Sequence, residues 1–149
     1  MTASSPPTGP IVPVCDEDAQ PFYDATRNGE LRIQRCVDTG RWIFPPRPLS
    51  PFGRHEPPEW TAVSGRGTIW SFVVPHPPLL PYFAESAPFN VILVALEEDP
   101  NIRLTGNLLT REGGSLGEVD PATIEIGQPV RVVFDRLDEE WTLPRWVRV

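Results

Sequence analysis

Residues 59–76 read EWTAVSGRGTIWSFVVPH, a pattern of two strands separated by a Gly-Arg-Gly step at residues 65–67. Glycine inside a strand pattern is typical of a bulge or of a corner in a barrel, because it adopts backbone conformations that other residues avoid. The stretch therefore predicts the first strands of a sheet that bends sharply.

The sequence that follows continues the strand pattern. FNVILVALEED at residues 89–99 is strongly apolar, as expected of a strand buried on both faces, and NIRLTGNLLT at 101–110 is its expected antiparallel partner. A single helical turn is predicted at 120–124, before two last strands within 129–149. Five or six short strands with glycine corners predict an OB-type Greek-key barrel over residues 57–149, with a β-sandwich as the alternative.

A smaller module is predicted before the barrel. Residues 1–18 are rich in proline and small polar residues and are expected to be a disordered tail. A short helix is predicted at 19–27, and the alternating segments ELRIQRC and RWIFPP, joined by a VDTG turn, predict a hairpin. A proline-rich loop at 45–58 completes a helix-and-hairpin module at 19–56. The whole fold is therefore expected to be mainly β.

Composition limits the kinds of partner. The chain has 149 residues, a formal net charge of −7, and 13 basic residues that are all arginine. This balance argues against non-specific binding to nucleic acid, which depends on neutralising phosphates. The N-terminal sequence lacks the pattern of a signal peptide, and no apolar run has the length of a membrane span. We therefore expect a cytoplasmic protein with no nucleic-acid or membrane partner.

The sequence holds no recognisable set of catalytic residues. Its two histidines, His55 and His76, lie in loop-like sequence, and neither a nucleophile elbow nor a phosphate-binding loop is present. Cys36 has no evident base to activate it, which favours a structural thiol over a nucleophile. By itself the chain is not expected to be an enzyme.

The stretch RCVDTGRWIFPPRPLSPFGR at residues 35–54 has the spacing of a zinc ribbon. A ribbon holds zinc with two Cys-x-x-Cys knuckles, because four thiolate or imidazole ligands close the tetrahedron. Counted from Cys36, the other three positions hold Thr39, Ser50 and Gly53. Only one ligand remains, so we expect no zinc, and no other cofactor is indicated.

The chain resembles a family of acyl-CoA-associated proteins with an OB fold and an N-terminal rubredoxin-like zinc ribbon, known as domain of unknown function 35. The similarity depends on seven segments in the family's order. These are PFYDATRNGELRIQRC, GRWIFPPRP, EWTAVSGRGTIWSFVV, PFNVILVALEE, IRLTGNL, IEIGQPVRVVF and TLPRW. The family's pattern has cysteine at positions 36, 39, 50 and 53. The resemblance therefore makes Cys36 a relic ligand of a degenerate ribbon, whose loop we expect Trp42, Phe44, Phe52 and the prolines to hold.

The resemblance implies a non-catalytic accessory subunit. Its partner would be a thiolase-like enzyme, such as a thiolase, an acyltransferase or a steroid or lipid side-chain aldolase, that acts on acyl-CoA thioesters. In such a hetero-oligomer the chain would stabilise the partner and help to form its CoA and acyl site, and the CoA thioester would be the substrate of the complex. A hot-dog-fold hydratase is a further partner implied by the family.

Three apolar elements are candidates for partner binding, because aromatic residues and arginine often anchor interfaces. The alternative is that they cover the open ends of the barrel, and we expect Trp60, Trp70 and Trp141 to pack in the core. The partner-binding candidates are Phe22 and Tyr23 in the helix, Leu79, Leu80, Tyr82 and Phe83 in a proline-rich loop, and Trp146 near the C-terminus.

Three arginines in or beside loops, Arg47, Arg54 and Arg66, are candidates for contact with CoA phosphates, with solvated surface charge as the alternative reading. Two other functions stay open at this point. One is an OB domain that binds single-stranded nucleic acid, which would need a basic groove with exposed aromatic side chains. The other is a small thioesterase or hydratase component acting on acyl-CoA.

Overall fold

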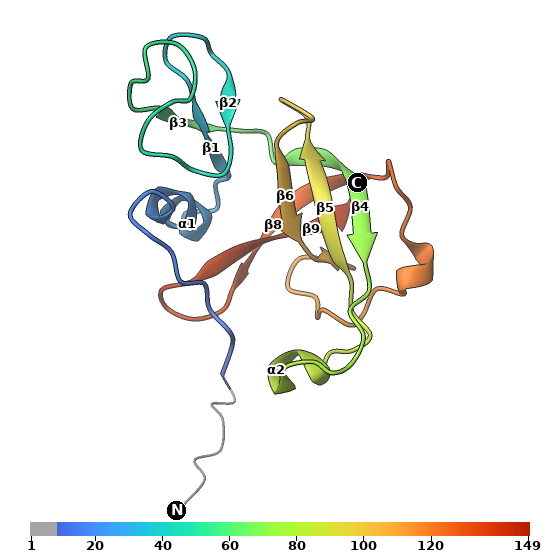
Figure 1. The fold of residues 1–149 in the computed structure, drawn as a ribbon. Coiled ribbons are helices and arrows are strands. Elements are labelled where there is room, and N and C mark those ends of the chain that lie inside the picture. The colour runs from blue at the N-terminus through green and yellow to red at the C-terminus, as the bar shows by residue number, and fades with distance from the viewer. Residues whose placement is uncertain (1–8) are drawn as a thin grey trace, which may run out of the picture.

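The computed structural model describes residues 9–149, which form two β-sheets and two short α-helices (Figure 1). The small sheet has the strand order β2-β1-β3, and the large sheet has the order β6-β5-β4-β8-β9-β7. The expected mainly β fold is confirmed. The elements are α1 (Gln20–Arg27), β1 (Arg32–Arg35), β2 (Trp42–Ile43), β3 (Glu59–Ala62), β4 (Arg66–Val73), α2 (Pro81–Ala84), β5 (Val91–Leu96), β6 (Arg103–Gly106), β7 (Leu108–Leu109), the 3-10 helix η1 (Pro121–Thr123), β8 (Pro129–Arg136) and β9 (Thr142–Arg148).

The predicted hairpin is present as β1 and β2, which pair antiparallel with Arg35 opposite Trp42. The structure adds β3 to this sheet, because β3 pairs with β1 along its whole length. The predicted barrel, residues 57–149, includes this strand. The structure pairs β3 with the small sheet instead, because a corner follows β3 directly and β4 is then the first strand of the large sheet. Residues 9–16 form no helix or strand, and the rest of the predicted tail, residues 1–8, lies outside the described residues.

The Gly-Arg-Gly step forms the expected corner. Gly65 has a φ of +74°, and a Cβ atom at this position would overlap the side chain of Val132. The bulge itself lies further along β4, where the pairing with β5 shifts between Ile69 and Ser71. Trp70 lies on the same outward face of β4 as Arg66 and Thr68, and 48% of its surface is exposed. The prediction that Trp70 packs in the core is therefore wrong.

The core of the barrel is built around Trp146. Its indole is completely buried, and its backbone pairs with Leu108 in the parallel contact between β9 and β7. Trp146 was predicted to bind a partner, and the structure shows instead that it packs inside the barrel, because strand alternation turns it inward from β9. The buried residues around it include Ile69, Ile92, Val94, Leu96, Leu104, Leu108 and Val130.

The predicted strand NIRLTGNLLT is broken into β6 and β7 by a polar clamp. The buried side chain of Asn90 accepts a hydrogen bond from the backbone N–H of Leu108 at 2.7 Å and donates one to its carbonyl at 2.9 Å. Asn107 donates from its side chain to the carbonyl of Asn90. The chain therefore pairs with β5 only as far as the end of β6, and the next strand, β7, pairs with β9. This second pairing closes the large sheet into a barrel.

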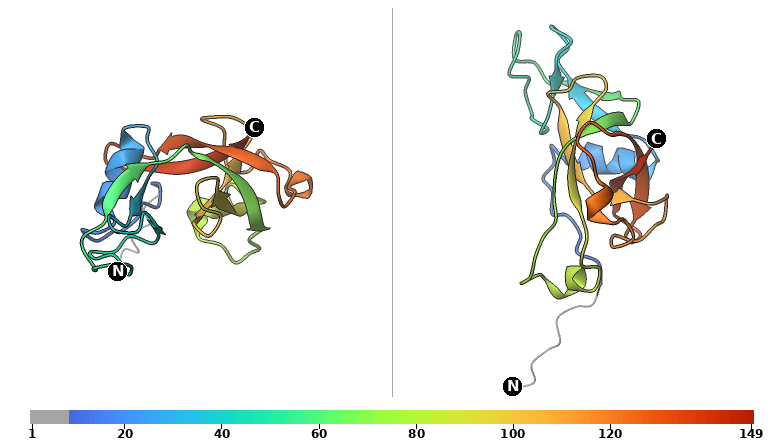
Figure 2. Two further views of the ribbon diagram at one scale, coloured as in Figure 1. Left: turned by 90° about the horizontal axis from the view of Figure 1, so that it is seen from above. Right: turned by 90° about the vertical axis from the view of Figure 1, so that its right-hand side faces the viewer.

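The hairpin of β8 and β9 extends from the barrel and supports α1 (Figures 1 and 2). The hydroxyl of Thr26 lies 2.7 Å from the carbonyl oxygen of Thr142, to which it can donate. The ring of Tyr23 meets Trp141 edge-on, with centroids 5.1 Å apart. Phe22 is 8% exposed and belongs to the same core cluster as the barrel residues, so α1 buries more apolar surface than its sequence suggested.

Candidate functional site

An apolar groove runs along one side of the molecule, between α1 and the loop that joins β4 to β5. It consists of two hollows that share residues of β6 and β9. The N-terminal segment contributes Ile11 to one hollow and Pro13 to the other. The main wall residues are Phe22, Tyr23 and Phe44 at one end, Tyr82, Phe83 and Phe89 at the other, and Thr105, Gly106, Leu143 and Arg145 between them.

The loop between β4 and β5 has its own aromatic cluster. Tyr82 and Phe83 meet edge-on with centroids 5.2 Å apart, and Phe83 stacks on Phe89 at 5.7 Å. Proline at the start of α2 and these ring contacts give the loop a fixed shape. Leu79 is half-buried, whereas Leu80 is 59% exposed at the start of α2.

The structure brings four of the seven predicted partner-binding residues to one groove. Phe22 and Tyr23 reach it from α1, and Tyr82 and Phe83 reach it from the loop. Leu79 and Leu80 lie in the same loop but not on the groove wall. Trp146 lies beneath the groove in the core.

Arg145 is the charged residue on the groove wall that sequence reasoning missed. It is 9% exposed, and its Nε lies 3.2 Å from Oδ2 of Asp135, while Nη1 donates to Oδ1 of Asn107. A buried guanidinium needs such partners, because an unpaired charge away from water is strongly unfavourable. The signal in the sequence was an arginine directly before Trp146 in the last predicted strand. It gives the groove one fixed cationic group among apolar walls.

The four ribbon positions come together where the β1–β2 turn meets the loop at residues 50–54. The Sγ of Cys36 lies 3.7 Å from the carbonyl oxygen of Phe52. The hydroxyl of Ser50 accepts from the N–H of Phe52 at 3.0 Å. Hydrogen bonds from Ser50, and then from Thr39, lower the pKa of the Cys36 thiol to about 7. The structure therefore brings Thr39, Ser50 and the backbone of Phe52 around the single thiol of Cys36.

The family's zinc ion does not fit this donor set. Cys36 offers one thiolate, Thr39 and Ser50 offer weakly coordinating hydroxyls, and Gly53 has no side chain. Within residues 9–149, no cluster of three or more histidine, cysteine or acidic side chains is arranged to hold a metal ion.

The aromatic residues expected to hold the ribbon loop do so only in part. The ring of Phe52 lies 3.8 Å below the guanidinium carbon of Arg41, and Trp42 lies 4.8 Å from that of Arg35. Phe44 instead points toward Phe22, with centroids 6.3 Å apart, and lines the groove.

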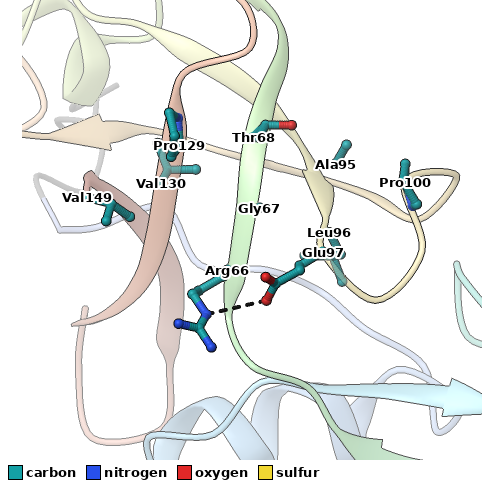
Figure 3. A pocket seen from close by; sticks show the side chains of 10 residues that line it. All are labelled: Arg66, Gly67, Thr68, Ala95, Leu96, Glu97, Pro100, Pro129, Val130 and Val149. Atoms are coloured by element: carbon teal, nitrogen blue, oxygen red, sulfur yellow. Dashed lines mark ion pairs between the residues drawn. The ribbon is translucent and has the colours of Figure 1, made fainter.

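The three arginines proposed for CoA differ in what they already bind. Arg54 is paired with Asp38, and this contact lowers the pKa of the carboxyl. Arg66 lies 3.3 Å from Glu97 at the mouth of a separate hollow between β4, β5 and β8 (Figure 3). Arg47 is held through its backbone, which exchanges two hydrogen bonds with the side chain of Gln34. Among the described residues its guanidinium has no acidic partner.

Comparison with known proteins identifies both parts of the fold. Residues 60–135 match the family model for the C-terminal OB-fold domain of ChsH2, and residues 24–49 match that for the ChsH2 rubredoxin-like zinc ribbon domain. These matches confirm the predicted OB fold and ribbon relationship. None of the helices formed by residues 9–149 has the length and apolar character needed to cross a membrane.

The chain is 36% identical over 140 residues to the 3-oxo-4,17-pregnadiene-20-carboxyl-CoA hydratase alpha subunit of Mycobacterium tuberculosis, and 32% identical over 132 residues to a probable enoyl-CoA hydratase alpha subunit of Thermomonospora curvata. These alignments cover 94% and 89% of this chain but only 40% and 38% of the relatives. The chain thus spans about two fifths of the length of these relatives.

Two further matches extend over most of both chains. A DUF35 domain-containing scaffold protein of Methanothermobacter thermautotrophicus is 34% identical over 111 residues, which are 74% of this chain and 75% of the relative. Among solved structures, a chain of the Ltp2-ChsH2(DUF35) aldolase superposes with a TM-score of 0.78 at 31% identity. The superposed region covers 91% of this chain and 98% of the aldolase chain.

Proposed function

Because the chain belongs to the ChsH2 family of zinc-ribbon and OB-fold (DUF35) proteins, we propose that it is a non-catalytic accessory subunit of a thiolase-like enzyme that acts on acyl-CoA thioesters. The observation that carries this proposal is the match to the Ltp2-ChsH2(DUF35) aldolase, which extends over nearly all of both chains. A steroid or lipid side-chain aldolase is the member of this class that the match favours.

The apolar groove is the proposed contact surface for that partner. Aromatic walls with a fixed cation are typical of interface centres, where apolar area and one or two charged groups are buried together. Phe83 and Phe89 give one wall, and Phe22 and Phe44 give the other. Leu80, which is 59% exposed beside the groove, would be buried only by a partner.

Arg47 is the arginine best placed to contribute to a CoA site in such a complex. Arg54 and Arg66 already have carboxylate partners, whereas the Arg47 guanidinium has none among the described residues. Its backbone is fixed by Gln34, so the side chain starts from a defined point. This would favour a contact with a phosphate group of bound CoA.

The experiment is co-expression with a thiolase-like protein of the same organism, followed by size-exclusion chromatography. We expect one hetero-oligomer, with aldol cleavage or another acyl-CoA reaction that the thiolase-like protein performs poorly alone. Leu80→Ser should weaken the complex by roughly tenfold. The matched control is Ile126→Ser, since Ile126 is 69% exposed in a different segment. Separate elution of two soluble and fully active proteins would refute the proposal.

A hydratase component is the second candidate, and the names of the two hydratase alpha subunits support it. In this reading a hot-dog-fold hydratase is the partner, or the chain serves an acyl-CoA hydratase or thioesterase. Hydration of an enoyl-CoA by the isolated chain, or its co-elution with a hot-dog-fold protein and not with the thiolase-like one, would favour this candidate.

A nucleic-acid function receives less support from the barrel surface. Trp70 is an exposed aromatic residue on β4, but the guanidinium carbon of Arg103 already lies 3.9 Å above its ring. One face of the ring on which a base could stack is therefore already occupied from within the chain. A flat binding curve with single-stranded DNA at low salt is the expected result.

A further inference from the structure

Asp38 and Arg54 link the two loops that a zinc ion joins in a metal-bound ribbon. Nη2 of Arg54 lies 2.6 Å from Oδ1 of Asp38, and Nε lies 3.0 Å from the same oxygen. The backbone N–H of Arg54 donates to Oδ2 at 2.7 Å. Asp38 belongs to the first loop, between ribbon positions 36 and 39, and Arg54 directly follows position 53. One carboxylate therefore binds the second loop through both side chain and backbone.

The geometry of this pair is stronger than that of an ordinary surface ion pair. Both carboxylate oxygens accept hydrogen bonds, and a forked contact of this kind is geometrically specific. The side chain of Asp38 is 18% exposed, whereas that of Arg54 is 74% exposed. Because the acceptor is shielded, the contact is screened less than a pair between two free side chains.

The Asp38 side chain also lies where the fourth zinc ligand would begin. A Cβ atom at Gly53 would be 2.6 Å from Oδ2 and 2.7 Å from Cβ of Asp38. Gly53 in addition has a φ of +62°, which disfavours any other residue. In this arrangement a cysteine at position 53 and the bound Asp38 carboxylate exclude each other.

We propose that the Asp38–Arg54 pair is a metal-independent clamp that replaces zinc in this chain. The ion pair joins the loops, Cys36 contacts the second loop at Phe52, and Arg41 covers the Phe52 ring. Within the second loop, Ser50 accepts from the N–H of Phe52. The clamp accounts for the order of a ribbon that retains one of four ligands. The proposed role of the clamp does not depend on which enzyme the chain assists.

The test measures opening of the loop in the intact chain by hydrogen–deuterium exchange with mass spectrometry. Asp38→Asn should accelerate exchange in peptides covering residues 36–54 roughly two- to fivefold, with peptides from β5 and β8 unchanged. The matched control is Glu30→Gln, which removes the ion pair between Glu30 and Arg32. This pair, with a distance of 2.8 Å between Arg32 Nε and Glu30 Oε2, lies in the same module but joins residues that are close in sequence and does not link the two loops. Exchange at residues 36–54 should be unchanged in this control.

Arg54→Gln is the second variant, because its exposed side chain can be replaced without disturbing folding. It should accelerate exchange in the same peptides while retaining the backbone contact. A chelator should leave exchange in the wild-type chain unchanged, and metal analysis should find no stoichiometric zinc. The proposal is overturned if protein purified without added metal holds one zinc per chain, or if both clamp variants exchange no faster than Glu30→Gln.

Discussion

Replacing Trp146 by alanine distinguishes a core residue from an interface anchor. The indole is completely buried and packs among Leu108, Val130 and the other core residues. Removing a buried tryptophan side chain costs about 3–5 kcal/mol. That is a large part of the roughly 5–15 kcal/mol that stabilises an ordinary domain. We therefore expect Trp146→Ala to destabilise the isolated chain by about 3–5 kcal/mol, before any partner is present.

Two further variants give losses of unfolding free energy with which that of Trp146→Ala can be compared. Trp146→Phe removes about three ring atoms, which at roughly 0.8 kcal/mol for each buried carbon gives a loss of about 2 kcal/mol. The indole N–H has no hydrogen-bond partner among the described residues, so phenylalanine gives up no such contact. Trp70→Ala should cost less than about 1.5 kcal/mol, because 48% of that side chain is already exposed.

Urea unfolding of the purified chain, followed by fluorescence and circular dichroism, measures these differences. With a slope of about 2 kcal/mol per molar urea, Trp146→Ala should lower the midpoint by roughly 2 M. Trp146→Phe should lie between Trp146→Ala and the wild type. If Trp146→Ala unfolds at the wild-type midpoint but no longer binds the partner, the burial of Trp146 and the correction of its role are both refuted.

Two other substitutions test individual elements by the same unfolding assay, and a third is tested by its affinity for the partner. Gly65→Ala should cost at least about 1–2 kcal/mol, because its φ is positive and its Cβ would meet Val132; a neutral result would contradict the corner. Thr26→Val should cost about 1 kcal/mol by removing the hydrogen bond to Thr142, and an unchanged midpoint would mean that α1 is not held there. Arg145→Met should weaken partner binding, whereas equal affinity would remove this residue from the interface.

Features with a local signal were predictable from the sequence. The hairpin of β1 and β2, the cap of η1 by Asp120 and the corner at Gly65 each follow from residues a few positions apart. That cysteine fills only one of the four ribbon positions is read directly from the sequence. The general position of the apolar loop with Tyr82 and Phe83 was also visible, since its prolines and aromatics are adjacent in sequence.

Features that depend on distant contacts were not predictable in this way. Trp70 lies on the outward face of β4, and the sequence does not tell which face of this strand is outward. The break between β6 and β7 requires Asn90 to reach Leu108. The inward position of Trp146 depends on β9 pairing with two strands at once. Alternation of apolar residues marks two faces of a strand but does not tell which face the barrel closes around.

The ribbon module is joined to the barrel by apolar packing. Phe22, Leu31 and Ile33 belong to the same buried cluster as Trp146, so α1 and β1 are anchored by a shared hydrophobic core. Zinc in a ribbon acts further out, where two loops lie apart from that core. Ordering those loops requires only a local link between them, which one carboxylate and one guanidinium supply at Asp38 and Arg54. This explains how substitution of three ligands is compatible with an intact module.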